Sequence, residues 1–82
     1  MPAARCGFLS APAGWSGDYH PTPRRQFLFV LRGIFEGTAS DGVVRRFGPG
    51  GVLLMEDTTG KGHATRIIGD EDALAAVVQL PE

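Results

Sequence analysis

The stretch from residue 14 to residue 33, GWSGDYHPTPRRQFLFVLRG, decides the fold of this chain. Its second half contains an apolar run, FLFVL at 27–31, which ends just before Arg32 and Gly33 and is rich in the aromatic and β-branched residues typical of strands. Its first half is polar and holds Pro21 and Pro23, which impose extended backbone on the residues before them and suit the entry to a strand. A polar cluster at the mouth of a buried strand is where a β-barrel places a small-molecule or metal site.

The rest of the chain is predicted to form short strands separated by turns. The 82 residues include Gly 12 and Pro 6, a content that favours many turns over long helices. Beside the clearest strand at 26–32, whose two faces both look buried, we expect strands at 15–20, 34–39, 43–47, 52–55, 63–68 and 73–80.

This pattern predicts an all-β protein, an antiparallel sandwich or barrel. The run at 73–76 also has helical propensity, but its place after the turn at 69–72 favours a final strand. The chain is accordingly divided into a short N-terminal arm, residues 1–13, which we interpret as a short strand or an extended segment, and a β-barrel domain, residues 14–82.

Size and charge narrow the classes of partner. A domain of 82 residues buries only roughly 60–65% of its unfolded surface, which makes added burial by dimerisation an expectation. The formal net charge of −1 provides no general attraction to nucleic acid or to an anionic membrane. Two arginine pairs, Arg24-Arg25 and Arg45-Arg46, are interpreted as solvated strand ends, with phosphate binding as the alternative.

Cysteine use and the first residues predict a cytoplasmic protein. Cys6 is the only cysteine, so no internal disulfide can form, and we interpret it as an inert thiol. The apolar residues near the start are interrupted by Gly7, Ser10 and Pro12, which a signal peptide would not tolerate, and no stretch is long enough to span a bilayer.

The spacing of the polar cluster is that of a known motif. It runs Gly14, five residues, His20, one residue, Thr22, three residues, Gln26, six residues, Gly33. This frame resembles the first motif of the cupin superfamily, Gly-x5-His-x-His-x3/4-Glu-x6-Gly. Downstream, Gly51 and the segment Thr58-x-Gly60-x2-His63-x3-Ile67 resemble the second motif, and the short segment between the motifs is similar to that of small single-domain cupins of bacteria.

The resemblance implies a cupin-like antiparallel jelly-roll barrel whose motif histidines point into its mouth and help to hold one divalent metal. On the first motif His20, Thr22 and Gln26 would share the inward face, above an apolar floor. On the second motif His63, Thr65 and Ile67 would do so. The implied metal ligands are His20, Gln26 and His63, and imidazole nitrogen suits Fe, Zn, Ni or Mn.

Two departures from the family pattern weaken such a centre. Thr22 stands where the family has a second histidine, and Gln26 stands where it has a glutamate. The loss of one imidazole and one charge lowers metal affinity, so a metal-free pocket is the alternative. Glu56 or Asp57 are candidates for the missing carboxylate, and Trp15 is either a core anchor or an aromatic pocket wall.

Three functions therefore stay open. The first is a small-molecule-binding module using His20, Gln26 and His63, with Trp15, Thr22, Glu56 and Thr65 as further ligand-binding residues. The second is a metal-dependent oxygenase or isomerase acting on a small organic substrate. The third is a structural or assembly protein that forms a homodimer through the outer strand face carrying Phe27, Phe29 and Leu31. The sequence does not establish whether the chain is an enzyme.

Overall fold

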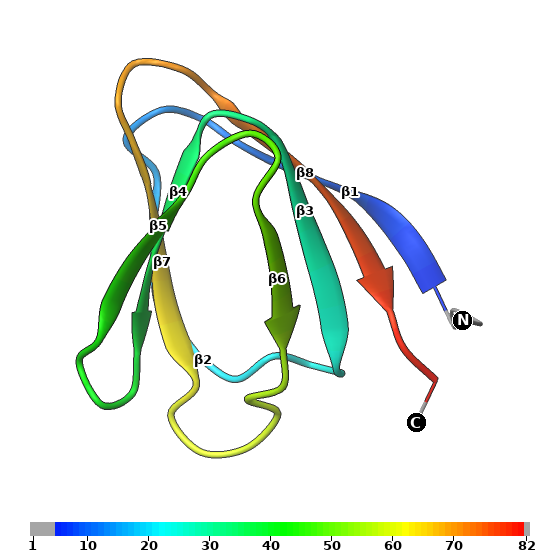
Figure 1. Ribbon diagram of the computed structural model, residues 1–82. Helices are drawn as coiled ribbons and strands as arrows, with labels where there is room; N and C mark the ends of the chain where they lie inside the picture. Colours follow the sequence, from blue (N-terminus) through cyan, green and yellow to red (C-terminus); the bar gives the residue numbers. More distant parts are fainter. Residues whose placement is uncertain (1–4, 82) are drawn as a thin grey trace.

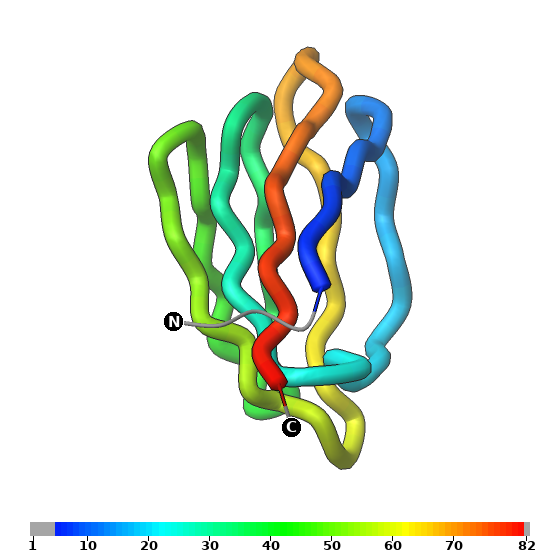
Figure 2. Tube along the Cα trace, turned by 90° about the vertical axis from the view of Figure 1, so that its right-hand side faces the viewer, coloured from blue at the N-terminus to red at the C-terminus, as the bar shows by residue number. Residues whose placement is uncertain are grey.

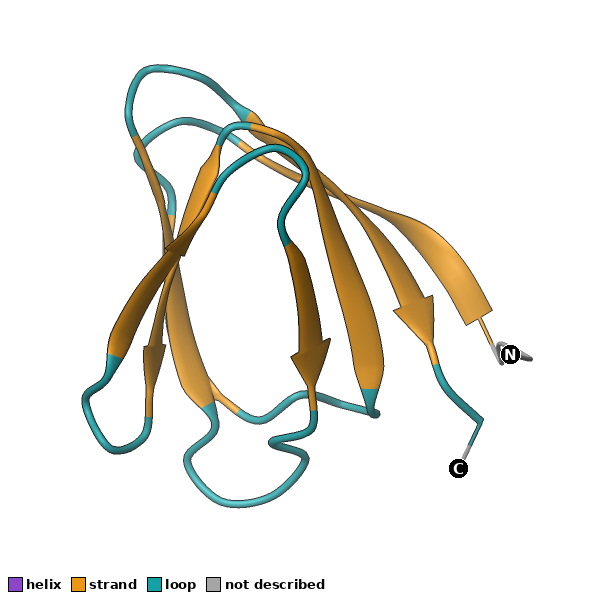
Figure 3. Ribbon diagram, in the orientation of Figure 1, coloured by secondary structure: helices purple, strands orange, loops and turns teal. Residues whose placement is uncertain are grey.

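The computed structural model describes residues 5–81, which form eight β-strands and no helix (Figures 1 and 3). The first four residues of the expected N-terminal arm lie outside this range. The strands are β1 (Arg5–Ala11), β2 (Ser16–His20), β3 (Gln26–Arg32), β4 (Ile34–Ala39), β5 (Val44–Phe47), β6 (Val52–Met55), β7 (His63–Ile68) and β8 (Ala73–Gln79).

The strands pair in two four-stranded antiparallel sheets that face each other. Sheet I has the order β1-β8-β3-β6, and sheet II has the order β2-β7-β4-β5. The sheets converge at one end of the molecule and diverge at the other (Figure 1). This confirms the predicted all-β antiparallel jelly roll. Within residues 5–81 each strand pairs only inside its own sheet, so the fold is a sandwich of two sheets rather than a closed barrel.

Residues 5–11 of the expected arm form an edge strand of sheet I. β1 pairs with β8 over its whole length, from Arg5 opposite Gln79 to Ala11 opposite Ala73. Six of its seven side chains are exposed. The strand therefore depends on its backbone ladder with β8, which hydrophobic periodicity in the sequence cannot reveal.

The hydrophobic core lies between the sheets. Its buried members come from the inward faces of both sheets: Leu28, Val30, Phe35, Ile67, Ala73 and Ala75. Ala75 is fully buried in β8, which is the central neighbour of β1 and β3. The predicted final strand is thus confirmed, because tertiary pairing on both sides overrides the helical propensity of its alanines.

The two faces of β3 differ in burial. Leu28 and Val30 point inward and are 6% and 2% exposed, whereas Leu31 is 49% exposed. Phe27 and Phe29 on the outward face are only partly buried. The expectation that both faces are buried is wrong for the single chain. The reason is that no strand within residues 5–81 covers the outer face of sheet I, which faces the viewer in Figure 2.

Every regular element in residues 5–81 is a strand, and that part of the chain accordingly contains no helix able to cross a membrane.

Candidate ligand-binding site

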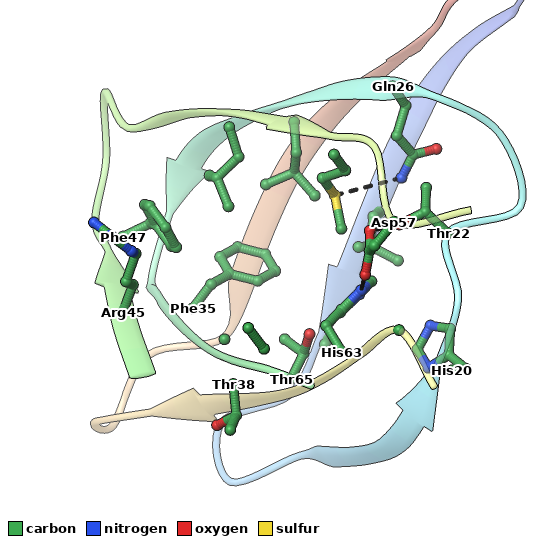
Figure 4. Close-up of a pocket in the computed structure, with 18 of the residues that line it drawn as sticks. His20, Thr22, Gln26, Phe35, Thr38, Arg45, Phe47, Asp57, His63 and Thr65 are labelled. Carbon is green, nitrogen blue, oxygen red and sulfur yellow. Dashed lines mark hydrogen bonds and ion pairs between the residues drawn. The ribbon is translucent and has the colours of Figure 1, made fainter. Parts of the chain in front are cut away.

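A cavity of about 600 Å³ lies between the two sheets, a size that suits a small organic molecule. Its apolar walls come from inward side chains of both sheets, among them Leu28, Phe35, Phe47, Leu53 and Ile67. Polar side chains gather on one side of the cavity, where the end of β2 and the starts of β3 and β7 meet the loop between β2 and β3 and the loop after β6 (Figure 4). This polar cluster consists of His20, Thr22, Gln26, Asp57 and His63.

The two histidines of the chain meet because the ends of two strands are paired. His20 ends β2, His63 begins β7, and the two residues lie directly opposite each other in sheet II. Their ring centroids are 5.0 Å apart. Opposite residues of an antiparallel pair project to the same face, so the pairing places both imidazoles at the cavity.

Gly62 permits this approach. Its φ is +75°, a conformation that side chains rarely adopt, and a Cβ at this position would lie 2.0 Å from the carbonyl oxygen of His20. The loop before His63 therefore lies directly on the backbone of His20 and Pro21.

Each histidine uses Nδ1 for a hydrogen bond inside the protein. Nδ1 of His20 lies 2.9 Å from the carbonyl oxygen of Asp18, and Nδ1 of His63 lies 2.6 Å from Oδ2 of Asp57. A carbonyl or an ionised carboxylate can only accept, so both Nδ1 atoms are donors. The Nε2 of each neutral ring then keeps its lone pair, free for a ligand, a proton or a cation.

Asp57 is the carboxylate of the polar cluster. The Thr22 hydroxyl donates to its Oδ1 over 2.6 Å, and the Thr22 amide donates to its carbonyl oxygen over 2.9 Å. Burial raises the pKa of Asp57, but hydrogen bonds from Thr22 and His63 outweigh burial and leave the pKa below its ordinary value. The carboxylate therefore stays ionised at neutral pH and holds the orientation of the His63 ring.

Glu56, which we expected to bind ligand, directs its carboxylate elsewhere. Although it borders the cavity, its Oε2 pairs with the Arg25 guanidinium at 3.0 Å, and both side chains are largely exposed. Of the two adjacent carboxylates named from the sequence, Asp57 is thus the one that joins the histidines.

We expect Asp57→Asn to reduce stability at neutral pH and to flatten its acid dependence. A depressed carboxyl pKa contributes stability that is present above the unfolded value of 3.8 and lost as pH falls through the lower folded value. Replacing charged hydrogen bonds by neutral ones should cost about 1–2 kcal/mol at pH 7 and less at pH 3. Urea unfolding at both pH values measures this.

Glu36→Gln is the matched control for this prediction. Glu36 lies outside the cavity, and the Arg66 guanidinium, followed by that of Arg46, also lowers its pKa. The Glu36→Gln variant should remove a separate part of the acid dependence of stability without affecting His63. Equal pH dependence in wild type and Asp57→Asn would contradict the assigned role of Asp57.

Gln26 lies on the inward face of β3, as expected, and is 9% exposed. Its Oε1 accepts a hydrogen bond from Nε2 of Gln79 at 3.3 Å, and its own Nε2 lies 3.7 Å from Sδ of Met55. Both partners are its cross-strand neighbours in sheet I. The amide group is therefore engaged within the sheet.

The donors present do not fit the metal centre that the motif resemblance implied. Across residues 5–81 no three or more His, Cys, Asp or Glu side chains converge as a metal-binding group. The amide oxygen of Gln26 accepts from Gln79, and the hydroxyl of Thr22 donates to Asp57. Only the two imidazoles of the implied ligand set remain as available metal ligands. Ligation of Fe, Zn, Ni or Mn by His20, Gln26 and His63 stays a prediction.

Trp15 and Thr65 both line the cavity. The indole of Trp15 covers Gly17, where a Cβ would lie 2.5 Å from the ring, and the residue is 41% exposed. Trp15 is thus a wall of the cavity and not a buried anchor. Thr65 lies between Gly17 and Gly37 in the cross-strand pairing of sheet II.

Two further residues line the cavity: Gly37, which was not selected from the sequence, and Arg45, which was interpreted there as part of a solvated strand end, with phosphate binding as the alternative. Gly37 of β4 lies opposite both Thr65 and Arg45, and a Cβ on Gly37 would have no neighbour within 4 Å. Arg45 lines the cavity from β5. The only sequence signal for either residue is the alternation of inward and outward positions along a strand, which does not reveal which face is inside.

Two opposed sheets with these strand orders and a pair of histidines at the cavity define the class: the chain has the jelly-roll fold of the cupin superfamily. Its structural neighbours include proteins described as cupins, which confirms the resemblance noted in the two motifs. No protein-family model and no curated protein matches the sequence.

Three solved structures illustrate the similarity. The DMSP lyase DddQ from Ruegeria pomeroyi DSS-3 is 28% identical with a TM-score of 0.76, and the match covers 94% of this chain and 38% of the lyase. A Cupin 2 conserved barrel domain protein from Salinispora arenicola CNS-205 is 21% identical with a TM-score of 0.75, over 99% of this chain and 71% of that protein. A sugar phosphate isomerase of the cupin superfamily from Silicibacter pomeroyi is 16% identical with a TM-score of 0.70, and the match covers 94% of this chain and 50% of the isomerase. The chain thus spans well under two thirds of the lyase and of the isomerase.

Proposed function

We propose that this domain binds a small organic molecule in the cavity between its sheets. The observation that carries the proposal is the cavity itself, about 600 Å³ with apolar walls and one polar cluster. Such a cavity orients an apolar ligand body by a small number of hydrogen bonds. The similarity to a lyase at 28% identity supports a small-molecule function, and the cytoplasmic location stays a prediction.

The polar cluster equips the site for proton transfer. Asp57 accepts from Nδ1 of His63, and this leaves Nε2 of His63 as the group that meets a ligand. A carboxylate in this position fixes the tautomer and the orientation of the ring, so that the lone pair of Nε2 is presented to the ligand. We therefore assign His63 as the acid–base group if the bound molecule reacts, with Asp57 and Thr22 as positioning residues.

A metal-dependent oxygenase or isomerase is the second candidate. It is favoured by one observation, the 5.0 Å separation of two imidazoles whose Nδ1 atoms are both engaged. Two nitrogen ligands alone bind divalent cations weakly. Elemental analysis after incubation with Fe, Mn, Ni or Zn, repeated on His20→Ala and His63→Ala, tests this candidate. Stoichiometric metal lost in both variants would favour it over the metal-free site.

We expect small organic molecules to perturb the NMR signals of the cavity residues, including the Trp15 indole and the His63 ring. A panel of fragments titrated into the 15N-labelled chain measures this. Gly37→Leu should abolish the perturbations, because its side chain enters the open space beside Gly37 without a positive φ.

Gly48→Ala is the matched control for the fragment titration. A Cβ at Gly48 likewise meets nothing within 4 Å, but this residue does not line the cavity, so fragment binding should be unchanged. The absence of cavity perturbations throughout the panel would refute the proposed binding function.

We propose in addition that the outer face of sheet I pairs with the same face of a second copy. Its cross-strand register forms two apolar rows of four side chains, with one member from each strand. The first row is Cys6, Val78, Phe27 and Leu54, and the second row is Phe8, Ala76, Phe29 and Val52.

The chemistry of the apolar rows selects the partner. Neither row contains a charged residue, and Phe8, Val52 and Leu54 are 78%, 55% and 45% exposed. The partner surface must therefore be apolar as well, and a twofold axis through this face supplies the same rows from the second chain. The core of an 82-residue domain is small, so this burial would add materially to its stability.

A further inference from the structure

We propose that the cavity selects a small carboxylic acid, whose carboxylate is bound by Arg45 across the cavity from the histidine pair. This inference rests on the proposed binding function and specifies its ligand class. The evidence is the position of Arg45, its lack of a protein partner and the empty space beside Gly37.

The two arginines of the pair at 45–46 have opposite surroundings. Arg46 projects to the outer face of sheet II, where its Nε lies 2.9 Å from Oε2 of Glu36. Successive side chains of a strand project to opposite faces, and Arg45 accordingly lines the cavity. Within the described part of the chain, Arg45 has no hydrogen bond or ion pair. Its guanidinium is therefore available to a ligand.

Arg45 is also the only lysine or arginine among the described residues that line the cavity. One guanidinium matches one carboxylate, because its planar fork can donate two parallel hydrogen bonds to the two oxygens. A phosphate dianion carries more charge and is commonly met by more than one cation. A single arginine thus favours a carboxylate.

The floor beside Arg45 leaves room for the ligand body. Gly37 lies between Arg45 and Thr65 in one cross-strand row, and a Cβ on Gly37 would meet no atom within 4 Å. The side chains of Phe35 and Phe47 line the same cavity and lie near Arg45 in Figure 4. An apolar body can therefore lie across the row with its acid group at Arg45.

The span between the two polar ends limits the length of the ligand. Arg45 is on β5 and His63 is on β7, with β4 between them, and Ala39, the partner of His63, is two residues from Gly37. Two strand spacings and one two-residue step place their Cα atoms about 12 Å apart. Both side chains reach into this span, so the molecule that joins them is short.

The test compares three probes of one shape on the whole 82-residue chain: 4-phenylbutanoate, its uncharged amide and 3-phenylpropyl phosphate. Calorimetry should show the carboxylate binding about tenfold more tightly than the amide. Arg45→Gln should remove this preference, and Arg45→Lys should retain part of it.

Arg46→Gln is the matched control, since it removes a neighbouring charge from the opposite face, and it should keep the full preference. Equal affinities of carboxylate and amide would overturn the anion subsite while the binding function stands. Tighter binding of the phosphate, lost in Arg45→Gln, would overturn the carboxylate assignment. If the cavity binds none of the three probes and also none of the fragments in the NMR titration, the binding function itself is refuted.

Discussion

Gly62→Ala will lower the free energy of unfolding by about 2–5 kcal/mol, from backbone strain combined with overpacking. The added Cβ would lie 2.0 Å from the carbonyl oxygen of His20 and 2.5 Å from Cα of Pro21. Both contacts are with backbone, so no side-chain rotation relieves them. The loop must move away from β2, which also separates His20 from His63. Urea unfolding measures the first effect, and imidazole NMR shifts measure the second.

Gly60→Ala separates the steric contact from the backbone conformation. Gly60 has a φ of +73°, close to that of Gly62, but a Cβ there meets nothing within 4 Å. The Gly60→Ala variant should lower the free energy of unfolding by only about 1–2 kcal/mol, which is the penalty for a residue with a side chain in the left-handed conformation. If the two variants were equally destabilised, the close approach of the loop to His20 would not be a determinant of the fold.

Introducing glutamate at Phe8 and Val52 will dissociate the proposed homodimer. These two residues end the second apolar row and are 78% and 55% exposed, so their replacement should leave the monomer folded. Burying each apolar side chain contributes about 1.5–3 kcal/mol, and a buried unpaired charge opposes association further. The dissociation constant should rise more than about 100-fold.

Light scattering measures this change in assembly. The wild-type chain of 8.7 kDa should scatter as a dimer of twice that mass, and the double variant as a monomer. Val44→Glu is the control, because Val44 is 53% exposed but belongs to sheet II. A wild-type monomer at about 100 μM, well above the dissociation constant that burial of both rows predicts, would rule out the dimer.

Most of the strands could be predicted because their local signals agree. The run at 26–32 is apolar and β-branched or aromatic, and it became β3 with the predicted bounds. Gly33, with a positive φ, marks the turn after it, and Pro21 and Pro23 mark the loop before it. For the region of β1 the sequence left a short strand and an extended arm open, because the pairing with β8 is a backbone property and a mostly exposed edge strand has no inward apolar pattern of its own.

The candidate site could be predicted in its positions but not in its connections. Motif spacing selected His20 and His63, and the structure pairs them. The same spacing suggested Gln26 as a metal ligand, although its amide bonds to Gln79, a residue far away in the sequence. Whether Glu56 or Asp57 contacts the histidine depends on the direction of the chain after β6. The sequence does not specify this direction, because the two carboxylates are adjacent.

The sequence by itself determined the strands, the turns, the cupin motif frame and the residue types available to the site. Only the tertiary structure decided which sides of those strands face the cavity. It separated Arg45 from Arg46, joined Asp57 to His63 and left the apolar rows of sheet I uncovered. The physical reason is that alternation along a strand tells neighbours apart, while the inside is created only when a second sheet, distant in sequence, packs against one face.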